Sequence, residues 1–240
     1  MLSVVIPAYN EARRLPPTLV QIRSYLRSVG LQHELLVVDD GSRDDTVARV
    51  RALDKAVQII ELRPNRGKGY AVRRGMLAAR GQRILFTDAD LSTPIEELEL
   101  LNGALDRGAE VALGSRAVKR ELIMLRQPWH REQMGKLFNL CVQLIAVSGV
   151  RDTQCGFKLF TRQAAMDIFS RSNMDRFAFD VELVALAKLL GYPVAEVPVR
   201  WFNSADSRVN VLADPLQMYF DLWRIRAKIK ALAKALGRKW

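Results

Sequence analysis

Short apolar runs alternate with segments of helical spacing along the first half of the chain, up to Arg116. The runs that predict strands are residues 2–7, 34–38, 57–62, 83–87 and 111–114. The segments that predict helices are residues 15–29, 45–53, 70–79 and 94–107, the second of them capped by Asp44 or Asp45. This alternation predicts an α/β fold with a mostly parallel sheet, right-handed crossovers and flanking helices. The strands are apolar throughout, which is typical of burial on both faces.

The alternation stops after Arg116. We expect residues 126–129 to form a loop and residues 132–147 to form a broad apolar helix, followed by a return to α/β structure through about residue 202. No internal repeat or low-complexity linker interrupts the chain. The pattern therefore predicts one catalytic domain over residues 1–212 and a basic helical appendage over residues 213–240.

The appendage has one apolar stripe at helical spacing, with lysines and arginines away from it. The stripe consists of Leu222, Ile225, Ile229, Leu232 and Leu236. A basic amphipathic helix with aromatic residues is typical of a helix that lies on an anionic membrane surface. Packing of the stripe against its own domain, or against a second copy in a homodimer, is the alternative.

The chain of 240 residues has 37 Lys and Arg against 26 Asp and Glu, a net charge of +11. This excess favours a polyanionic partner, which is a nucleic acid, an anionic lipid surface or a phosphorylated substrate. The chain has no run of about 18 apolar residues, so the sequence does not predict a membrane span. Charge alone does not choose among the three partners.

Polar clusters follow the predicted strands of the first half, at the point where each strand ends. They are residues 7–11 (Pro-Ala-Tyr-Asn-Glu), 39–42 (Asp-Asp-Gly-Ser), 65–69 (Asn-Arg-Gly-Lys-Gly), 88–90 (Asp-Ala-Asp) and 114–116 (Gly-Ser-Arg). Ligands of open α/β sheets bind beyond the carboxyl ends of the strands, so we expect one crevice. The glycine spacing matches neither a P-loop nor a dinucleotide-binding fingerprint.

The first clusters suit a nucleotide. Tyr9 offers a flat face for a base, and Asp39 or Asp40 can accept hydrogen bonds from a base N–H or a ribose hydroxyl. The glycines on either side of Lys68 would let the backbone approach a ligand, while Lys68 supplies a cation. The residues assigned to the nucleotide part are Pro7, Tyr9, Glu11, Asp39, Asp40, Lys68, Gly69, Asp88, Ala89 and Asp90.

Two carboxylates, Asp88 and Asp90, end the fourth apolar run with one small residue between them. Residues two apart in an extended strand point to the same side. Mg²⁺ and Mn²⁺ take oxygen ligands, typically one or two carboxylates together with substrate phosphates. The pair therefore predicts a Mg²⁺ or Mn²⁺ site with Asp88 and Asp90 as ligands; a simple turn is the alternative.

On these stretches the chain resembles the family 2 glycosyltransferases of the GT-A type, which have a Rossmann-like sheet flanked by helices. Residues 152–160 (Asp-Thr-Gln-Cys-Gly-Phe-Lys-Leu-Phe) and 179–183 (Phe-Asp-Val-Glu-Leu) resemble the dolichyl-phosphate β-glucosyltransferases among the polyprenyl-phosphate enzymes, rather than the mannosyl branch. The resemblance covers about residues 2–208. The chain departs from it in lacking the family's membrane spans and in having Asp-Ser-Arg at residues 206–208, where the family usually has Gly-Ser-Lys.

The resemblance implies inverting, metal-dependent transfer of a hexose to a polyprenyl or dolichyl phosphate at a membrane surface, with UDP-glucose as the expected donor. The candidate catalytic residues are Asp88, Asp90, Arg116, Asp152 and Asp180. Asp152 or Asp180 would orient the acceptor, and each is alternatively a cap or turn carboxylate. The candidates for the acceptor phosphate are Arg116, Arg131, Lys136 and Arg208, each of which is alternatively a solvated surface cation. The implied location is the cytoplasm, with peripheral attachment to the cytoplasmic face of a membrane.

Two other interpretations compete. A family 2 transferase that uses GDP-mannose or a soluble acceptor would share the same motifs. A nucleic-acid-binding module would explain the charge of +11. It would not explain carboxylates gathered at one sheet edge, because these repel phosphate unless a metal is present. We therefore do not expect nucleic acid as a partner.

Overall fold

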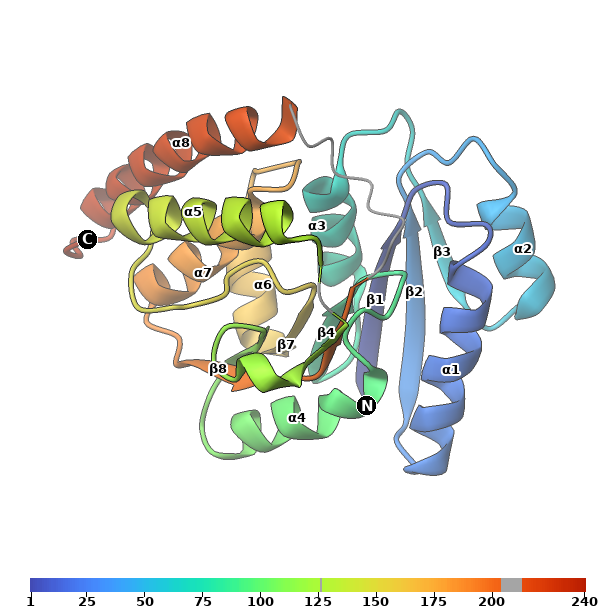
Figure 1. Ribbon diagram of the computed structural model, residues 1–240. Helices are drawn as coiled ribbons and strands as arrows, with labels where there is room; N and C mark the ends of the chain where they lie inside the picture. Colours follow the sequence, from blue (N-terminus) through green and yellow to red (C-terminus); the bar gives the residue numbers. More distant parts are fainter. Residues whose placement is uncertain (126, 204–212) are drawn as a thin grey trace.

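Seven strands form one sheet in the order β3-β2-β1-β4-β7-β5-β8 (Figure 1). The computed structural model describes all residues except 126 and 204–212, and it leaves the side chains of residues 130, 131 and 213–216 undescribed. The strands of the sheet are β1 (Leu2–Ala8), β2 (His33–Asp39), β3 (Gln58–Glu61), β4 (Arg83–Thr87), β5 (Val111–Ser115), β7 (Phe157–Thr161) and β8 (Val194–Pro198). The five strands predicted in the first half are all present.

The strands pair in parallel except β7, which lies antiparallel between β4 and β5. Ala8 pairs with Asp39, and Asp39 with Glu61, so the first three strands end at one edge of the sheet. Because β7 runs the other way, it begins at that edge, where Phe157 pairs with Thr87. Reversal of this strand therefore brings residues 152–156 beside residues 88–90.

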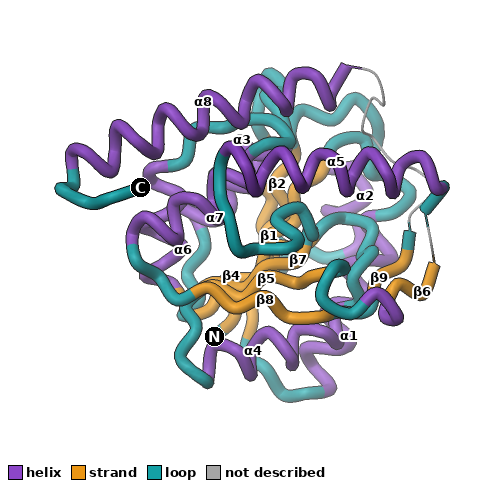
Figure 2. Tube along the Cα trace, turned by 60° about the vertical axis from the view of Figure 1, so that its left-hand side comes forward, coloured by secondary structure: helices purple, strands orange, loops and turns teal. Residues whose placement is uncertain are grey.

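Helices cover both faces of the sheet (Figure 2). The helices are α1 (Leu15–Ser28), α2 (Thr46–Leu53), α3 (Lys68–Ala78), α4 (Leu98–Asp106), α5 (Trp129–Ile145), α6 (Arg162–Arg171), α7 (Phe179–Leu190) and α8 (Ala213–Ala235). Helices α1, α2 and α4 contribute to one hydrophobic cluster, and α3, α5, α6, α7 and α8 contribute to the other. Short 3-10 helices (Ile95–Glu97 and Arg120–Leu122) and a separate pair of strands, β6 (Ile123–Leu125) and β9 (Trp201–Phe202), complete the described fold.

The boundaries differ from the predicted ones most clearly at α5. Its first residue is Trp129, which the sequence pattern assigns to a loop; the other end of that loop, residue 126, lies outside the described residues. Pro128 has an extended ψ of 141°, and its carbonyl accepts a hydrogen bond from the Glu132 amide at 3.2 Å. Pro128 is therefore the N-cap of the helix. The sequence pattern places the start of the helix at residue 132 because the first turn of the helix is mostly polar.

The stripe of α8 packs on the protein's own core. Leu222, Ile225 and Ile229 are 0% exposed and belong to the same cluster as α7 and α5. Lys228 fixes the helix, because its Nζ donates to Glu182 Oε1 in α7 at 2.5 Å. The prediction that this stripe enters a membrane is therefore wrong for these three residues. The buried stripe packs α8 against the core, although Leu236 at its end remains 44% exposed.

Candidate active site

Three ion pairs lie at the carboxyl edge of the sheet, and their residues come from segments far apart in the sequence. Lys68 Nζ lies 2.6 Å from Asp88 Oδ1, Lys158 Nζ 2.5 Å from Asp180 Oδ1, and Arg116 Nε 2.7 Å from Asp152 Oδ2. Five of these six residues were candidates from the sequence. The arrangement sets alternating charges at the ends of β4, β5 and β7, where a bound phosphate and a metal ion would both find partners.

Asp88 contacts two other segments of the site. Its amide donates to the Gly156 carbonyl at 3.1 Å. A Cβ on Gly156 would lie 2.0 Å from Asp88 Oδ2, a distance that no real side chain allows. Gly156 therefore leaves the space in which the Asp88 carboxylate lies, and any larger residue would displace it.

Asp88 and Asp90 do not have the extended geometry that we expected. The strand β4 ends at Thr87, and residues 88–90 form a turn in which the Leu91 amide approaches the Asp88 carbonyl at 3.4 Å. Asp90 Oδ1 accepts a hydrogen bond from the Ser92 amide at 3.0 Å, and Oδ2 lies 3.8 Å from Arg14 Nη1. The two carboxylates thus have different partners, because a turn replaces the strand.

The residues at this turn fit a divalent cation by their chemistry. The side chains of Asp88 and Asp90 are 31% and 22% exposed, although the Oδ1 atom of Asp88 is itself buried. Among the described residues there is no group of three or more His, Cys, Asp and Glu side chains that would enclose a metal by themselves. Two carboxylates with substrate phosphates form a normal Mg²⁺ or Mn²⁺ site, so an open pair of this kind suits a metal that arrives with a nucleotide.

Lys68 and Asp180 affect each other's pKa through their charges. Burial lowers the pKa of Lys68, but the carboxylates of Asp88 and Asp180 raise it by more, so the lysine stays charged. Burial raises the pKa of Asp180, and the cations of Lys158 and Lys68 oppose that rise. Both lysines also lie over the ring of Phe86, at 5.5 and 5.6 Å from its centroid.

Lys158 was not among the predicted site residues. It is 0% exposed, and its Nζ donates to the Cys155 carbonyl as well as to Asp180. A single lysine inside the apolar strand Phe157–Thr161 was the available signal, because a buried cation requires a buried partner. The sequence did not show which carboxylate this was, since Asp180 lies on another element.

Asp152 holds the Arg116 side chain in one orientation. Its two carboxylate oxygens accept from Arg116 Nε and Nη2 at 2.7 and 2.8 Å, and Oδ2 also accepts from the Arg116 amide at 3.0 Å. Burial works to raise the pKa of Asp152, but Arg116 lowers it by more, to about 2. The Arg116 guanidinium lies 5.4 Å from the ring centroid of Trp201. Asp152 is thus a fixed anion that positions Arg116, and it is too acidic to serve as a base.

The two aspartates after β2 have different environments. Asp40 accepts hydrogen bonds from the amides of Arg66 and Gly67 at 3.0 and 2.7 Å, so both its oxygens hold the loop after β3. Asp39 Oδ2 accepts from the Ser42 amide at 3.0 Å, whereas its buried Oδ1 has no hydrogen-bond partner among the described residues. Asp39 is therefore the better acceptor for a ligand N–H, and Asp40 serves the backbone.

Gly69 also has a reason within the chain itself, apart from the predicted approach to a ligand. A Cβ there would lie 2.3 Å from the Met174 carbonyl oxygen and 2.7 Å from Phe179 Cβ. Gly67, with a φ of +118°, likewise approaches the Asp175 carbonyl. These glycines admit a neighbouring segment of the same chain, and Lys68 between them is the residue that reaches the site.

The loop after β1 connects to the Asp88–Asp90 turn through Arg14. Glu11 is buried and binds the Arg14 guanidinium through both carboxylate oxygens, at 2.5 and 2.7 Å. Arg14 in turn approaches Asp90. Pro7 and Tyr9, near the end of β1, are half-buried. Ala89 is buried, and its carbonyl accepts a hydrogen bond from Thr18 Oγ1 at 2.7 Å.

The predicted acceptor-phosphate residues are not all brought together. Arg116 lies at the site, whereas Lys136 projects from α5 and pairs with Glu132 on the same helix at 3.0 Å. The side chain of Arg131 and the whole of Arg208 lie outside the described residues. Arg116 is thus the candidate that the described geometry supports.

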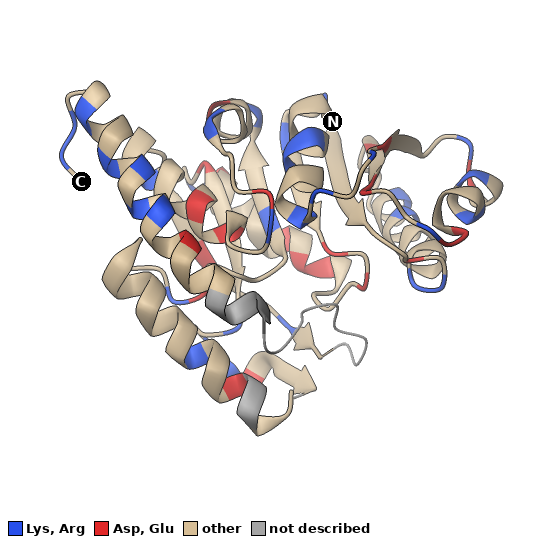
Figure 3. Cartoon of the chain, turned by 90° about the horizontal axis from the view of Figure 1, so that it is seen from above, with Lys and Arg blue, Asp and Glu red and all other residues tan. Residues whose placement is uncertain are grey.

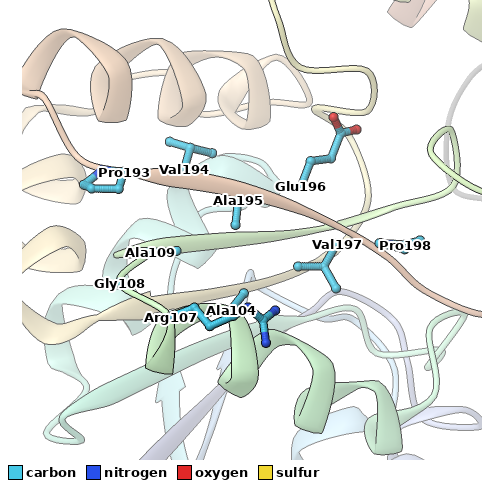
Figure 4. Close-up of a pocket in the computed structure, with 10 residues that line it drawn as sticks. All are labelled: Ala104, Arg107, Gly108, Ala109, Pro193, Val194, Ala195, Glu196, Val197 and Pro198. Carbon is cyan, nitrogen blue, oxygen red and sulfur yellow. The ribbon is translucent and has the colours of Figure 1, made fainter.

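A hollow of about 370 Å³ lies beside the edge strand β8 (Figure 4). Its lining is mostly small or apolar, and Arg107 and Glu196 are its charged residues. Glu196 already accepts from Ser115 Oγ at 2.6 Å and from the amides of Arg151 and Asp152 at 2.9 and 2.8 Å. The carboxylate therefore supports the Arg116–Asp152 pair, and the hollow has no cluster of reactive groups.

Comparison with known sequences gives consistent relatives. The sequence pattern of Glycosyl transferase family 2 matches residues 3–169. The dolichyl-phosphate beta-glucosyltransferase of Drosophila melanogaster is 42% identical, over 93% of this chain and 74% of the fly protein. The proteins of the same name from Homo sapiens (39% identical, over 95% of this chain and 75% of that protein) and Saccharomyces cerevisiae (35%, over 94% and 74%) are also similar.

Solved structures share the fold. Glucosyl-3-phosphoglycerate synthase from Mycobacterium tuberculosis, in complex with Mn²⁺, UDP and glucosyl-3-phosphoglycerate, superimposes with a TM-score of 0.71 at 21% identity, over 100% of this chain and 81% of that one. Its complex with UDP gives a TM-score of 0.70 at 20% identity, over 96% and 80%. The α/β architecture predicted from the sequence is therefore confirmed as GT-A-like.

Proposed function

The chain belongs to glycosyl transferase family 2 and is a nucleotide-sugar-dependent glycosyltransferase, and we propose that it transfers glucose from UDP-glucose to dolichyl phosphate. The substrates follow from the relatives named above, which are dolichyl-phosphate beta-glucosyltransferases over most of this chain. The observation in the fold that supports the proposal is the position of residues 152–158. These residues place Asp152, Gly156 and Lys158 beside the turn that carries Asp88.

The chemistry is a single displacement. A phosphate oxygen of the acceptor forms a bond to the anomeric carbon of glucose, the bond from that carbon to the β-phosphate oxygen of UDP breaks, and the electron pair leaves with UDP. A β-linked product from an α-linked donor requires attack from the opposite face, which inverts the anomeric carbon. A phosphate monoester has a second pKa of about 6, so it attacks largely as the dianion and needs no strong base. This agrees with a site in which Asp88, Asp152 and Asp180 are each paired with a cation.

We assign the donor side to residues at the ends of β1, β2 and β4. Asp39 Oδ1 would accept a hydrogen bond from the base, because it is buried without another partner among the described residues. Asp88 and Asp90 would hold Mg²⁺ or Mn²⁺, which neutralises charge on the leaving diphosphate when bound. Lys68, fixed next to Asp88, adds a second positive charge at the same place.

We assign the acceptor side to Arg116. A guanidinium held on one side by Asp152 and lying over Trp201 keeps donors free for a phosphate on its other side. Asp180 lies beside Lys68 and Lys158, where it balances their charge and sets their positions.

A donor screen with a short, water-soluble polyprenyl phosphate tests the proposal. We expect UDP release from UDP-glucose to depend on both the acceptor and Mg²⁺ or Mn²⁺, and to be faster than GDP release from GDP-mannose by about tenfold or more, the scale of one lost polar contact. Mass spectrometry of the product should show one hexose on the lipid phosphate. Faster turnover of GDP-mannose, or UDP release that is the same with and without acceptor, would contradict the assignment.

A further inference from the structure

The outer side of α5 is apolar, although it faces solvent. Trp129, Leu137, Leu140 and Leu144 are 76%, 64%, 54% and 71% exposed. They occur at helical spacing (i, i+8, i+11, i+15), so they line one side of the helix. The opposite side carries Val142, which is 0% exposed in the core. A helix that is apolar on both sides has a second surface to cover.

Helix α8 extends this surface. Tyr219, Phe220 and Trp223 are 39%, 57% and 49% exposed, while the buried side of the same helix packs on the core. The two helices are in contact, because Arg226 Nη1 in α8 donates to the Ile145 carbonyl at the end of α5 at 2.8 Å. Figure 3 shows them side by side. We call the seven exposed residues the α5–α8 face: Trp129, Leu137, Leu140, Leu144, Tyr219, Phe220 and Trp223.

Exposed apolar residues also precede α5 in the chain. Met124 and Leu125 of β6, just before α5, are 56% and 54% exposed. Strand β6 pairs with β9, where Trp201 lies against Arg116. The Phe202 amide in β9 donates at 2.8 Å to the carbonyl of Ser92, next to the Asp88–Asp90 turn. The β6–β9 pair therefore connects exposed apolar residues that precede α5 in the chain to Trp201, which lies beside Arg116.

The surroundings of the face are basic. Lys136 is 50% exposed, and the Arg224 side chain is 69% exposed beside Trp223. Lys230 and Lys234 are exposed further along α8, and Figure 3 shows blue positions along this helix. Glu132, the acidic residue of α5, is matched by both Arg120 and Lys136.

We propose that the α5–α8 face docks on the surface of an anionic lipid bilayer and so presents the crevice to an acceptor carried in that bilayer. The proposal rests on the proposed function for the nature of the acceptor. Exposed leucines, Trp and Tyr beside lysines and arginines match the apolar and anionic layers of a bilayer surface. A second copy of this chain fits less well, because both partners would carry a charge of +11. No described helix is long and apolar enough to span a membrane.

Flotation of the full chain with vesicles that contain no polyprenyl phosphate tests the face apart from catalysis. The vesicles are phosphatidylcholine alone, and phosphatidylcholine with phosphatidylserine at about 3:1. The variant Leu140→Gln changes a 54% exposed residue of the face, and the matched control Leu100→Gln changes a 48% exposed residue of α4, whose helix belongs to the other hydrophobic cluster. A triple variant, Leu137→Gln, Leu140→Gln and Leu144→Gln, enlarges the effect, and thermal melts verify folding.

We expect wild type and Leu100→Gln to float with the anionic vesicles, and the triple variant to bind them at least about tenfold more weakly. All three proteins should release UDP equally with a short, soluble acceptor. In a separate activity assay, with a polyprenyl phosphate added to the vesicles, only the triple variant should be slow. Equal vesicle binding by the triple variant overturns the proposal. So does a wild-type dimer in solution that the triple variant converts to monomer with vesicle binding unchanged. Normal vesicle binding with no transfer to any lipid phosphate would count against the proposed function and leave the face intact.

Discussion

Asp88 and Asp90, only one residue apart, have unequal tasks in the resting site. Asp88 already has a cation partner in Lys68, whereas Asp90 Oδ2 has Arg14 only at 3.8 Å. Binding of a metal would therefore change the surroundings of Asp88 more than those of Asp90. Asp90 is the better residue to substitute, because the fold depends on it less.

We expect Asp90→Asn to reduce turnover by about 100-fold or more, the scale of a lost charge-stabilising group in a catalytic site. The fold should persist, because an asparagine oxygen can still accept the hydrogen bond from the Ser92 amide. Release of UDP and a Mn²⁺ titration measure the effect, and an unchanged melting temperature is the control. Full activity of this variant, or of wild type in excess chelator, would remove Asp90 from the metal site.

Gly156→Ala tests whether Asp88 needs the space beside it. The new Cβ would overlap the Asp88 carboxylate, so we expect weaker Mn²⁺ binding and a loss of activity of about tenfold to 100-fold. Gly135→Ala in α5 is the matched control, because a Cβ added there would meet no atom of another segment within 4 Å. Equal metal affinity in the two variants would show that the position of Asp88 is unimportant.

The Arg116–Asp152 pair makes stability depend on pH in a defined direction. Burial works to raise the pKa of Asp152 and Arg116 lowers it by more, from the ordinary 3.8 to about 2. A lowered pKa stabilises the fold above pH 3.8, and this contribution is lost as the pH falls toward 2. We expect Asp152→Asn to lower the free energy of unfolding by about 2 kcal/mol at neutral pH. Urea titrations at a series of pH values should show the difference from wild type shrinking below pH 3.8; a constant difference would exclude this pair as its source.

At the scale of elements, α8 is the clearest case of one pattern with two outcomes. Its stripe has the spacing of a membrane-surface helix, and the same spacing suits packing against a protein core. Burial of Leu222, Ile225 and Ile229 decides for the core. The exposed aromatic residues of the same helix lie away from the stripe. A membrane could contact the helix at these aromatic residues.

Ile229→Ala should therefore destabilise the whole domain. We expect a loss of about 2–4 kcal/mol in the free energy of unfolding, with a single cooperative transition, because a fully buried side chain leaves a cavity. Leu236→Ala, at a 44% exposed residue of the same stripe, should cost less than about 0.5 kcal/mol. Two separate unfolding transitions would instead indicate that residues 213–240 fold as an independent appendage.

The strands and helices of the first half could be predicted because their burial follows local periodicity. The site was predictable where it consists of residues at strand ends, such as Asp88, Arg116 and Asp39. Lys158, Gly156 and Glu196 escaped prediction because their roles depend on the reversed strand β7 and its neighbours. A strand's direction is fixed by pairings distant in the sequence, and an apolar run has the same pattern in both directions.

At the scale of the whole molecule, the charged residues behind the net charge of +11 have different surroundings in different regions. At the active site Lys68, Arg116 and Lys158 are each paired with a carboxylate, whereas α8 exposes several cations with few acidic neighbours. Substrate recognition and attachment to a surface should therefore respond differently to ionic strength. Salt weakens contacts between exposed charges and affects partly buried ones much less.

The reversed strand β7 also has a consequence for synthesis of the protein. Strand β4 leaves the ribosome before β7, the partner of one of its edges. The partner is made about 70 residues after β4, which takes several seconds at about 5–20 residues per second. During that interval a nascent chain would hold a half-built sheet with an apolar, unpaired edge, the feature that promotes association between incomplete chains. The interval ends only when Thr161, the last residue of β7, has been made.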